Sequence, residues 1–113
     1  ERPARPQLPL YGILGEDIAG VAYAQVRARE CRFVGLGDVE GVSGVRQDLA
    51  AAVKRYSAAD SWESLQAEWR ASLEQLALRF LAGDAAVDPL PRACDYCGLQ
   101  AVCRVAVPVG AGR

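Results

Sequence analysis

The sequence of 113 residues contains no histidine and no methionine. The absence of histidine excludes histidine general bases, histidine-activated nucleophiles and every metal site with a histidine ligand, including the zinc site of the deaminases. A translated reading frame starts with Met. We therefore expect a chain that opens Glu1-Arg2-Pro3 and contains no Met to be a processed piece of a larger protein.

Long apolar runs and a strong excess of one charge are also absent. No apolar run approaches the roughly 20 residues of a membrane span, because Pro9 and Gly12 interrupt the stretch from Leu8 to Leu14, and we expect a soluble protein without a membrane partner. The net charge of -1 argues against binding nucleic acid by bulk electrostatics, so any such contact must be local. With 51% hydrophobic residues, residues 1–113 are predicted to form one domain with a single core.

The basic residues and the cysteines bear on the source genome of the protein and on its cellular compartment. All but one of the 13 basic residues are arginine and alanine is frequent, which favours a GC-rich bacterial genome. Three of the 4 cysteines gather near the C-terminus instead of spreading in pairs, and nothing resembles a signal peptide. These features argue against a secreted disulfide scaffold and lead us to expect the reducing bacterial cytoplasm.

The first half of the chain predicts a short helix and two strands. After a linker over residues 1–6, a helix over about residues 7–15 accommodates Pro6 and Pro9 in its first turn and ends at Gly15. The pattern of residues 18–31 predicts a strand that is buried early and exposed late, and a second strand over 32–39 suggests an antiparallel hairpin. A glycine-rich break follows over residues 40–44.

The second half predicts two helices and a cysteine-bearing loop. Apolar residues at helical spacing predict a short helix over 45–56 and a long amphipathic helix over 61–81. Asp60 and Glu63 stand in the capping-box relation at the start of the long helix, and Gly83 fits a left-handed C-cap. A proline-punctuated connector then leads to the cysteines at 94–103, and residues 104–113 are predicted to be a frayed tail.

The apolar stripe of the long helix contains two tryptophans, which are predicted to pack in the core and not to stack on bases. The stripe consists of Trp62, Leu65, Trp69, Leu73, Leu76 and Phe80.

Cys94, Cys97 and Cys103 have the spacing C-x2-C-x5-C, the sharpest motif in the chain. Three thiolates this close predict a metal site, with zinc or an iron-sulfur cluster as natural occupants. Both occupants require four ligands, and the fourth is Cys31, a carboxylate such as Asp95, a water or a cysteine outside this sequence. The same residues also fit three unpaired thiols or a redox pair, and Cys31 also fits a buried small hydrophobe.

Gln7 and Tyr11 lie four residues apart in QLPLY, on one face of the predicted helix. Alone, the pair also fits a surface amide above a half-buried ring. Together with the order of elements and the C-terminal cysteines, it resembles the C-terminal end of RecB-family nucleases, in particular AddB-like bacterial exonucleases and DNA repair proteins of the PD-(D/E)xK superfamily that carry an iron-sulfur staple. The resemblance covers nearly the whole chain.

This resemblance implies an α+β fold that is part of a restriction-endonuclease-like nuclease domain: a short helix, an antiparallel strand pair, a long amphipathic helix and a cysteine-bearing C-terminal loop. It implies that Gln7 and Tyr11 are supporting residues beside the catalytic metal site and DNA, and that Cys94, Cys97 and Cys103 bind a 4Fe-4S cluster. The family's fourth cysteine, and the acidic residues and lysine that hold Mg²⁺ or Mn²⁺, lie upstream of the Q-x-x-x-Y helix and have no match here.

Asp17, Asp38 and Glu40 do not stand in the pattern required of substitutes. The expected function is therefore the C-terminal portion of a DNA repair or recombination exonuclease, a partner of DNA and of a helicase subunit or domain, and catalytically incomplete alone. The alternative is a non-enzymatic zinc-binding interaction module that uses Cys31 together with the other three cysteines.

The predicted hairpin carries two further expectations. Arg27, Arg29 and Arg32 fit either phosphate contacts or a solvated edge beside Glu30. The unpaired edge of the two-strand sheet predicts that the isolated chain forms homo-oligomers.

Overall fold

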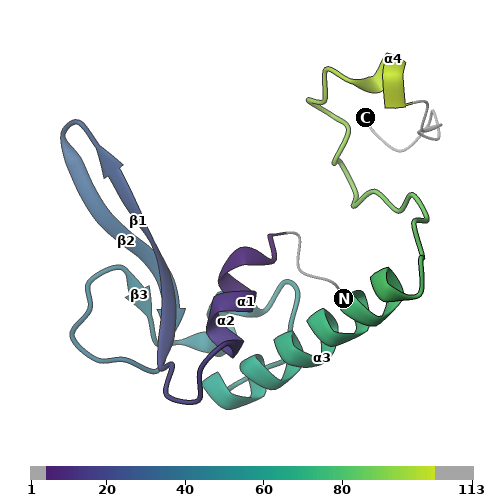
Figure 1. The fold of residues 1–113 in the computed structure, drawn as a ribbon. Helices are drawn as coiled ribbons and strands as arrows, with labels where there is room; N and C mark the ends of the chain where they lie inside the picture. Colours follow the sequence, from purple (N-terminus) through teal and green to yellow (C-terminus); the bar gives the residue numbers. More distant parts are fainter. Residues whose placement is uncertain (1–4, 104–113) are drawn as a thin grey trace.

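A computed structural model of the chain describes residues 5–103, in which four helices and three strands form an α+β fold (Figure 1). The α+β class is confirmed, and the predicted helices and strands occur in the predicted order, with one further strand, β3, and a four-residue helix, α4, in the predicted C-terminal loop. Most of the predicted linker over 1–6 and the whole predicted tail over 104–113 lie outside the described residues. No helix within the described part is long and apolar enough to cross a membrane.

The sheet is built on the predicted antiparallel hairpin. Strand β1 spans Gly20–Arg27 and strand β2 spans Glu30–Gly37, joined by a two-residue turn at residues 28 and 29. The predicted boundary, with the first strand running to Cys31, is wrong because the chain already reverses after Arg27, which pairs with Glu30. A strand of only two residues, β3 at Val45–Arg46, was missed by the sequence analysis and pairs in parallel with β2, giving the order β1-β2-β3.

Two short helices flank this sheet. Helix α1 spans Gln7–Ile13, which confirms the predicted short helix. Its predicted end at Gly15 is wrong, because Leu14 is the C-cap and Gly15 does not have the positive φ of a left-handed cap. Helix α2 spans only Leu49–Val53, so the predicted helix over 45–56 is too long at both ends. The physical reason at the N-terminal end is the cap, because the Asp48 side chain accepts a hydrogen bond from the Ala51 amide and starts the helix at Leu49, four residues after the strand residue Val45.

The long helix α3 spans Trp62–Leu81, close to the predicted range, but its cap differs from the prediction. Ser61 is extended and accepts a hydrogen bond from the Ser64 amide, while the Ser64 hydroxyl receives one from the Ser61 amide. The prediction of an Asp60–Glu63 capping box is therefore wrong by one position. Gly83 has a φ of 78°, which confirms the left-handed residue predicted after the helix.

The core lies where the first half of α3 meets α2 and the base of the sheet. Its buried residues are Leu49, Val53, Ala59, Trp62, Leu65 and Trp69. The two indole rings pack edge to face, with centroids 5.7 Å apart and an interplanar angle of 89°, which confirms their predicted place in the core. The apolar stripe of α3 is buried only in this half, because Phe80 near the end of the helix is 79% exposed.

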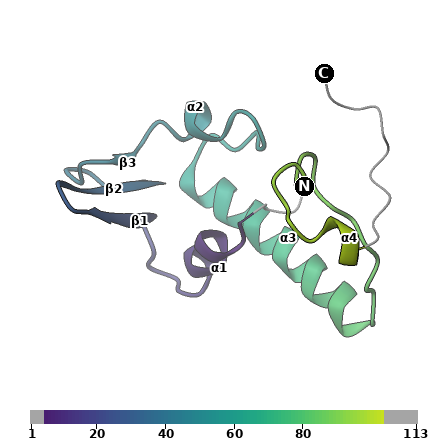
Figure 2. The same ribbon diagram turned by 90° about the horizontal axis from the view of Figure 1, so that it is seen from above.

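The chain beyond α3 leaves the body of the molecule. The segment 84–99 is irregular and ends in the four-residue helix α4 at Gln100–Cys103. In both views the hairpin and α4 lie on opposite sides of the molecule, with α1 and α3 between them (Figures 1 and 2). The fold therefore separates a packed body, made of the sheet, α1, α2 and the first half of α3, from the cysteine segment.

Candidate functional site

Helix α1 has a buried face and an exposed face. Pro9 and Gly12 are buried, while Gln7, Leu10 and Tyr11 are exposed, as helical spacing requires. The Gln7 side-chain amide lies 3.5 Å from the Tyr11 hydroxyl, at the long limit of a hydrogen bond. The prediction that these two residues share one face of a helix is confirmed in geometry, and that face points to solvent, where a ligand can reach it.

The buried face of α1 packs directly on α3 through a glycine. A Cβ atom built on Gly12 would lie 2.8 Å from Cζ3 of the Trp69 ring and 3.4 Å from a methyl carbon of Val21. Only a residue without a side chain allows α1 to approach the indole this closely. Gly12 therefore sets the distance between α1 and α3.

Three side chains on α3 donate hydrogen bonds to the C-terminal end of α1 and to the loop that follows it. Trp62, Gln66 and Arg70 follow one another at intervals of four, so they lie on one side of α3. Trp62 Nε1 donates to the Ile18 carbonyl at 2.5 Å, Gln66 Nε2 to the Gly12 carbonyl at 2.7 Å, and Arg70 Nη2 to the Ile13 carbonyl at 3.0 Å.

These donors satisfy carbonyls that the last turn of a short helix and the following loop leave open. The sequence analysis missed Gln66 and Arg70 because neither belongs to the apolar stripe of the predicted helix. The available signal was that Gln66 and Arg70 follow Trp62 at successive intervals of four residues. Through these contacts α3 fixes the orientation of α1, and with it the exposed pair Gln7 and Tyr11.

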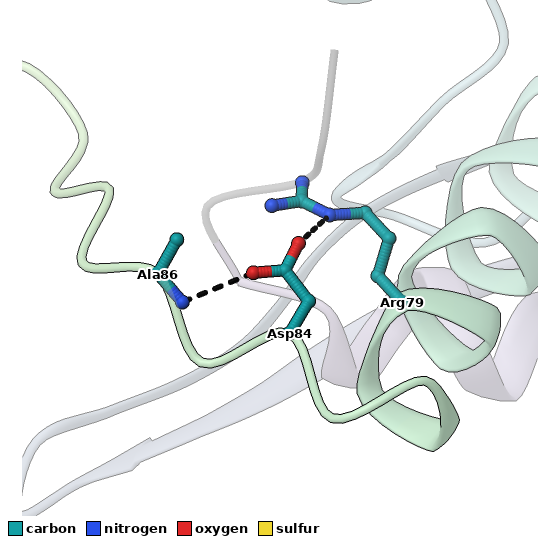
Figure 3. A network of polar contacts seen from close by, with 3 residues as sticks. All are labelled: Arg79, Asp84 and Ala86. Atoms are coloured by element: carbon teal, nitrogen blue, oxygen red, sulfur yellow. Dashed lines mark hydrogen bonds and ion pairs between the residues drawn. The ribbon is translucent and has the colours of Figure 1, made fainter.

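The exit from α3 is fixed by an ion pair (Figure 3). Arg79 Nε lies 2.6 Å from Asp84 Oδ2, and Asp84 Oδ1 accepts a hydrogen bond from the Ala86 amide at 3.0 Å. The Ala86 amide, followed by the Arg79 guanidinium, holds the pKa of Asp84 below its ordinary value. The contact sets the direction in which the chain leaves the helix toward the cysteines.

The cysteine segment consists of consecutive turns, in which Cys94 is half-buried and Cys97 and Cys103 are exposed. The Cys97 amide donates to the Cys94 carbonyl at 3.2 Å, which closes the C-x2-C step into a turn, and the Cys103 amide donates to the Leu99 carbonyl at 2.9 Å. All four cysteines of the chain lie within the described residues, and none of them forms a disulfide. Arg92, with a positive φ of 64°, pairs with Asp95 through Nε at 2.8 Å.

Three thiols within ten residues are suitable donors for a thiolate-bound metal, but the described residues do not gather them. Within residues 5–103, no three side chains of cysteine, aspartate or glutamate are close enough together to hold a metal ion. The carboxylate of Asp95, considered above as a fourth ligand, is bound to Arg92. The donor type therefore fits a thiolate-bound group, although the three thiols are not gathered around one point in the described residues.

Cys31 lies apart from the other three cysteines. It belongs to β2 near the turn of the hairpin, opposite Val26, while the other cysteines belong to the segment that ends in α4 (Figure 1). Its side chain is exposed, so the reading of Cys31 as a buried small hydrophobe is wrong. The reason is that the outer half of the hairpin extends beyond the core.

The remaining charged candidates are also exposed. Arg32 pairs with Glu30 at 3.4 Å and donates from Nε to the side chain of Gln25 at 3.1 Å. Asp17, Asp38 and Glu40 are exposed and belong to no group in the described part of the chain that could hold a metal ion. The described chain thus offers a braced helix with an exposed polar pair, and no acidic site of its own.

Comparison with known families decides the identity of this fold. A profile of the PD-(D/E)XK nuclease superfamily matches residues 1–104. The chain belongs to the PD-(D/E)XK nuclease superfamily. No curated protein and no solved structure matched the chain.

Membership of the PD-(D/E)XK superfamily confirms the broader part of the resemblance inferred from the sequence, including the fold class. It gives the chain a nuclease ancestry. The exposed polar pair on α1 can therefore be assessed as a site of contact with DNA.

Proposed function

We propose that this chain is the C-terminal portion of a RecB-like exonuclease that acts in DNA repair or recombination, and that it supplies the helix beside the active site. The observation that carries the proposal is the bracing of α1 by α3, which presents Gln7 and Tyr11 on an exposed face in a chain of nuclease ancestry. Helicase partnership and a bacterial cytoplasmic location belong to the same proposal.

Gln7 and Tyr11 have chemistry suited to holding a DNA strand. A carboxamide both donates and accepts hydrogen bonds, so Gln7 can orient a phosphate or a neighbouring ligand. A phenol ring can stack on a base and its hydroxyl can donate to a phosphate, and Tyr11 is 50% exposed. Both residues act as positioning groups for the strand, not as groups that break the phosphodiester bond.

The hydrolytic step is assigned to residues outside this sequence. The described part of the chain holds no cluster of carboxylates that could bind a metal ion. A Mg²⁺ or Mn²⁺ ion supplies an activated water and stabilises the negative charge that develops in phosphodiester hydrolysis. The 113-residue chain positions the DNA strand, and we expect it not to hydrolyse DNA alone.

Cys94, Cys97 and Cys103 are proposed as three ligands of a 4Fe-4S cluster, with the fourth ligand outside this sequence. Soft thiolates on one short segment support this assignment. The rival, a zinc site that includes Cys31, has no observation in its favour, because the hairpin and the cysteine segment lie on opposite sides of the molecule.

DNA binding tests the assignment of α1. Fluorescence anisotropy of a labelled single-stranded oligonucleotide, measured with EDTA, should show binding that weakens about fivefold or more in Tyr11→Ala, given the usual contribution of base stacking. Gln7→Ala should weaken binding by a smaller factor. Gln75→Ala, an exposed glutamine on α3, is the matched control and should bind like the wild type. Equal affinity of all four proteins would overturn the role given to α1.

Metal analysis tests the cysteine assignment separately. Protein purified without oxygen should contain iron and labile sulfide, lose both in Cys94→Ser, and keep both in Cys31→Ser. A colourless protein with stoichiometric zinc that is lost in Cys31→Ser would replace the cluster with the zinc module.

A further inference from the structure

The β1–β2 hairpin projects from the body of the molecule (Figure 1). Each strand has eight residues, which corresponds to a length of about 26 Å, and only the base of the hairpin contacts the core, through Val21 and Leu36. Every residue from 26 to 34 is exposed. A projecting, solvated arm of this kind adds nothing to the core, and its outer half is free to contact a partner.

The outer half of the hairpin carries an excess of positive charge. Residues 27–32 include three arginines and one glutamate. Glu30 forms its ion pair with Arg32, which also bonds to Gln25, so these charges are compensated within the sheet. Arg27 and Arg29 have no ion pair or side-chain hydrogen bond with any residue of the described chain. Two uncompensated guanidinium groups therefore lie at the turn, one on the last residue of β1 and one within the turn.

The turn and the N-terminal end of α1 point to the same side of the molecule (Figure 1). Gln7 is the first residue of α1 and Arg29 lies in the turn, so the end of α1 that begins the proposed DNA contact and the end of the hairpin lie toward the same side of the molecule (Figure 1). A DNA strand that contacts α1 can continue toward the hairpin. Because the whole chain has a net charge of -1, this local cationic site is the kind of contact that nucleic acid binding would require here.

We propose that the turn of the β1–β2 hairpin is a second DNA contact, in which Arg27 and Arg29 bind phosphates of the DNA backbone. The inference rests on the proposed function, because it assumes that the partner at α1 is DNA. Guanidinium groups bind phosphate oxygens through charge-assisted hydrogen bonds. Contacts of this kind position the strand without reading its sequence, so the hairpin should contribute equally to binding of different sequences.

The test compares two variants that each remove two exposed cations. Arg27→Ala/Arg29→Ala removes the proposed contacts, and Lys54→Ala/Arg55→Ala removes an exposed pair beyond α2 as the matched control. Binding of a labelled single-stranded oligonucleotide with EDTA is followed from about 50 to 200 mM salt. Circular dichroism and thermal unfolding establish that each variant is folded, and Arg27→Lys/Arg29→Lys restores the charges without the planar guanidinium.

The hairpin variant is expected to bind about tenfold more weakly at low salt, with a salt slope reduced by about 1.4, the value for two phosphate contacts on a single strand. The control should stay within about twofold of the wild type, and the lysine variant should recover most of the salt slope. Equal losses in the hairpin variant and the control would overturn the proposal, because binding would then depend on total charge alone.

Unchanged binding by the hairpin variant would also overturn the proposal while leaving DNA binding at α1 intact. Failure of the wild-type chain to bind any oligonucleotide would overturn both this inference and the assignment of α1. The two failures are therefore distinguishable in one set of titrations.

Discussion

The side-chain amide of Gln66 donates to the backbone carbonyl of Gly12 at 2.7 Å, although the two residues are 54 positions apart in the chain. Helix α1 has only seven residues, and a helix of this length is not stable in water without tertiary contacts. The bond from Gln66, together with the one from Arg70 to Ile13, ties the end of this short helix to the longest helix of the fold. The geometry of the exposed Gln7 and Tyr11 pair therefore depends on residues of α3 that lie far from the pair in the sequence.

Gln66→Ala is expected to destabilise the fold by about 1–2 kcal/mol, because it leaves the partly buried Gly12 carbonyl without its donor. Urea unfolding followed by circular dichroism measures this loss. Gln75→Ala removes a glutamine of the same helix that is exposed and should change stability by less than about 0.5 kcal/mol. Equal stability of the two variants would show that the contact does not brace α1.

Gly12→Ala should destabilise the fold by about 1–3 kcal/mol through overpacking, since the new methyl group would lie 2.8 Å from the Trp69 ring. Thermal unfolding reports the effect, and the near-ultraviolet signal of the tryptophans should change with it. Gly98→Ala is the matched control, because a methyl group there meets no atom within 4 Å. A Gly12→Ala protein as stable as the control would contradict the close packing of α1 on α3.

The Asp84 contact predicts a pH dependence at the end of α3. The Ala86 amide and Arg79 hold the pKa of Asp84 below its ordinary value of 3.8, so the stabilising effect of the ionised carboxylate is present above that value and is lost as the pH falls through the lower, folded pKa. The chemical shift of the Ala86 amide, followed by NMR against pH, should therefore change with a midpoint below 3.8. This pH-dependent change in the Ala86 amide shift should disappear in Asp84→Asn and persist in Glu74→Gln. A midpoint above 3.8 would contradict the contact.

Strand β1 lies at the edge of the sheet and predicts self-association of the isolated chain. It contains neither proline nor lysine, and its Tyr23 and Val26 side chains are exposed, so little opposes pairing with a second copy. Light scattering at increasing concentration should show oligomers that are weakened in Val26→Lys. Leu78→Lys, at an exposed position on α3, is the control and should not weaken them. A monomer at every concentration would count against this expectation.

The sequence was sufficient to predict those features that depend on local periodicity. Spacing of apolar residues located α3, and a spacing of four residues placed Gln7 and Tyr11 on one face of α1. The hairpin was predicted from two apolar runs, but its turn was not, because residues 27–29 carry no glycine, proline or asparagine to mark a reversal. The cap of α3 was misplaced for a similar reason, since Asp60 and Ser61 are both good capping residues and only the extended backbone of Ser61 decides between them.

The contacts that brace the candidate site could not be predicted from periodicity. The pairing of Gly12 with Trp69 and with Gln66 depends on how two helices cross, which local spacing does not determine. The two-residue strand β3 is too short for any pattern and exists because the chain returns beside Gly35 and Leu36. Exposure of Phe80 on the apolar stripe of α3 likewise follows from where the body of the fold ends.

A metal-dependent cleavage assay on the purified 113-residue chain tests the central claim most directly. With Mg²⁺ or Mn²⁺ and end-labelled single-stranded and duplex DNA, the account predicts no cleavage, because the proposed role of the chain is to position a DNA strand and its described residues hold no acidic metal site. Cleavage that requires the metal and is abolished by Gln7→Ala or Tyr11→Phe would contradict the account, and would place a complete active site within this chain.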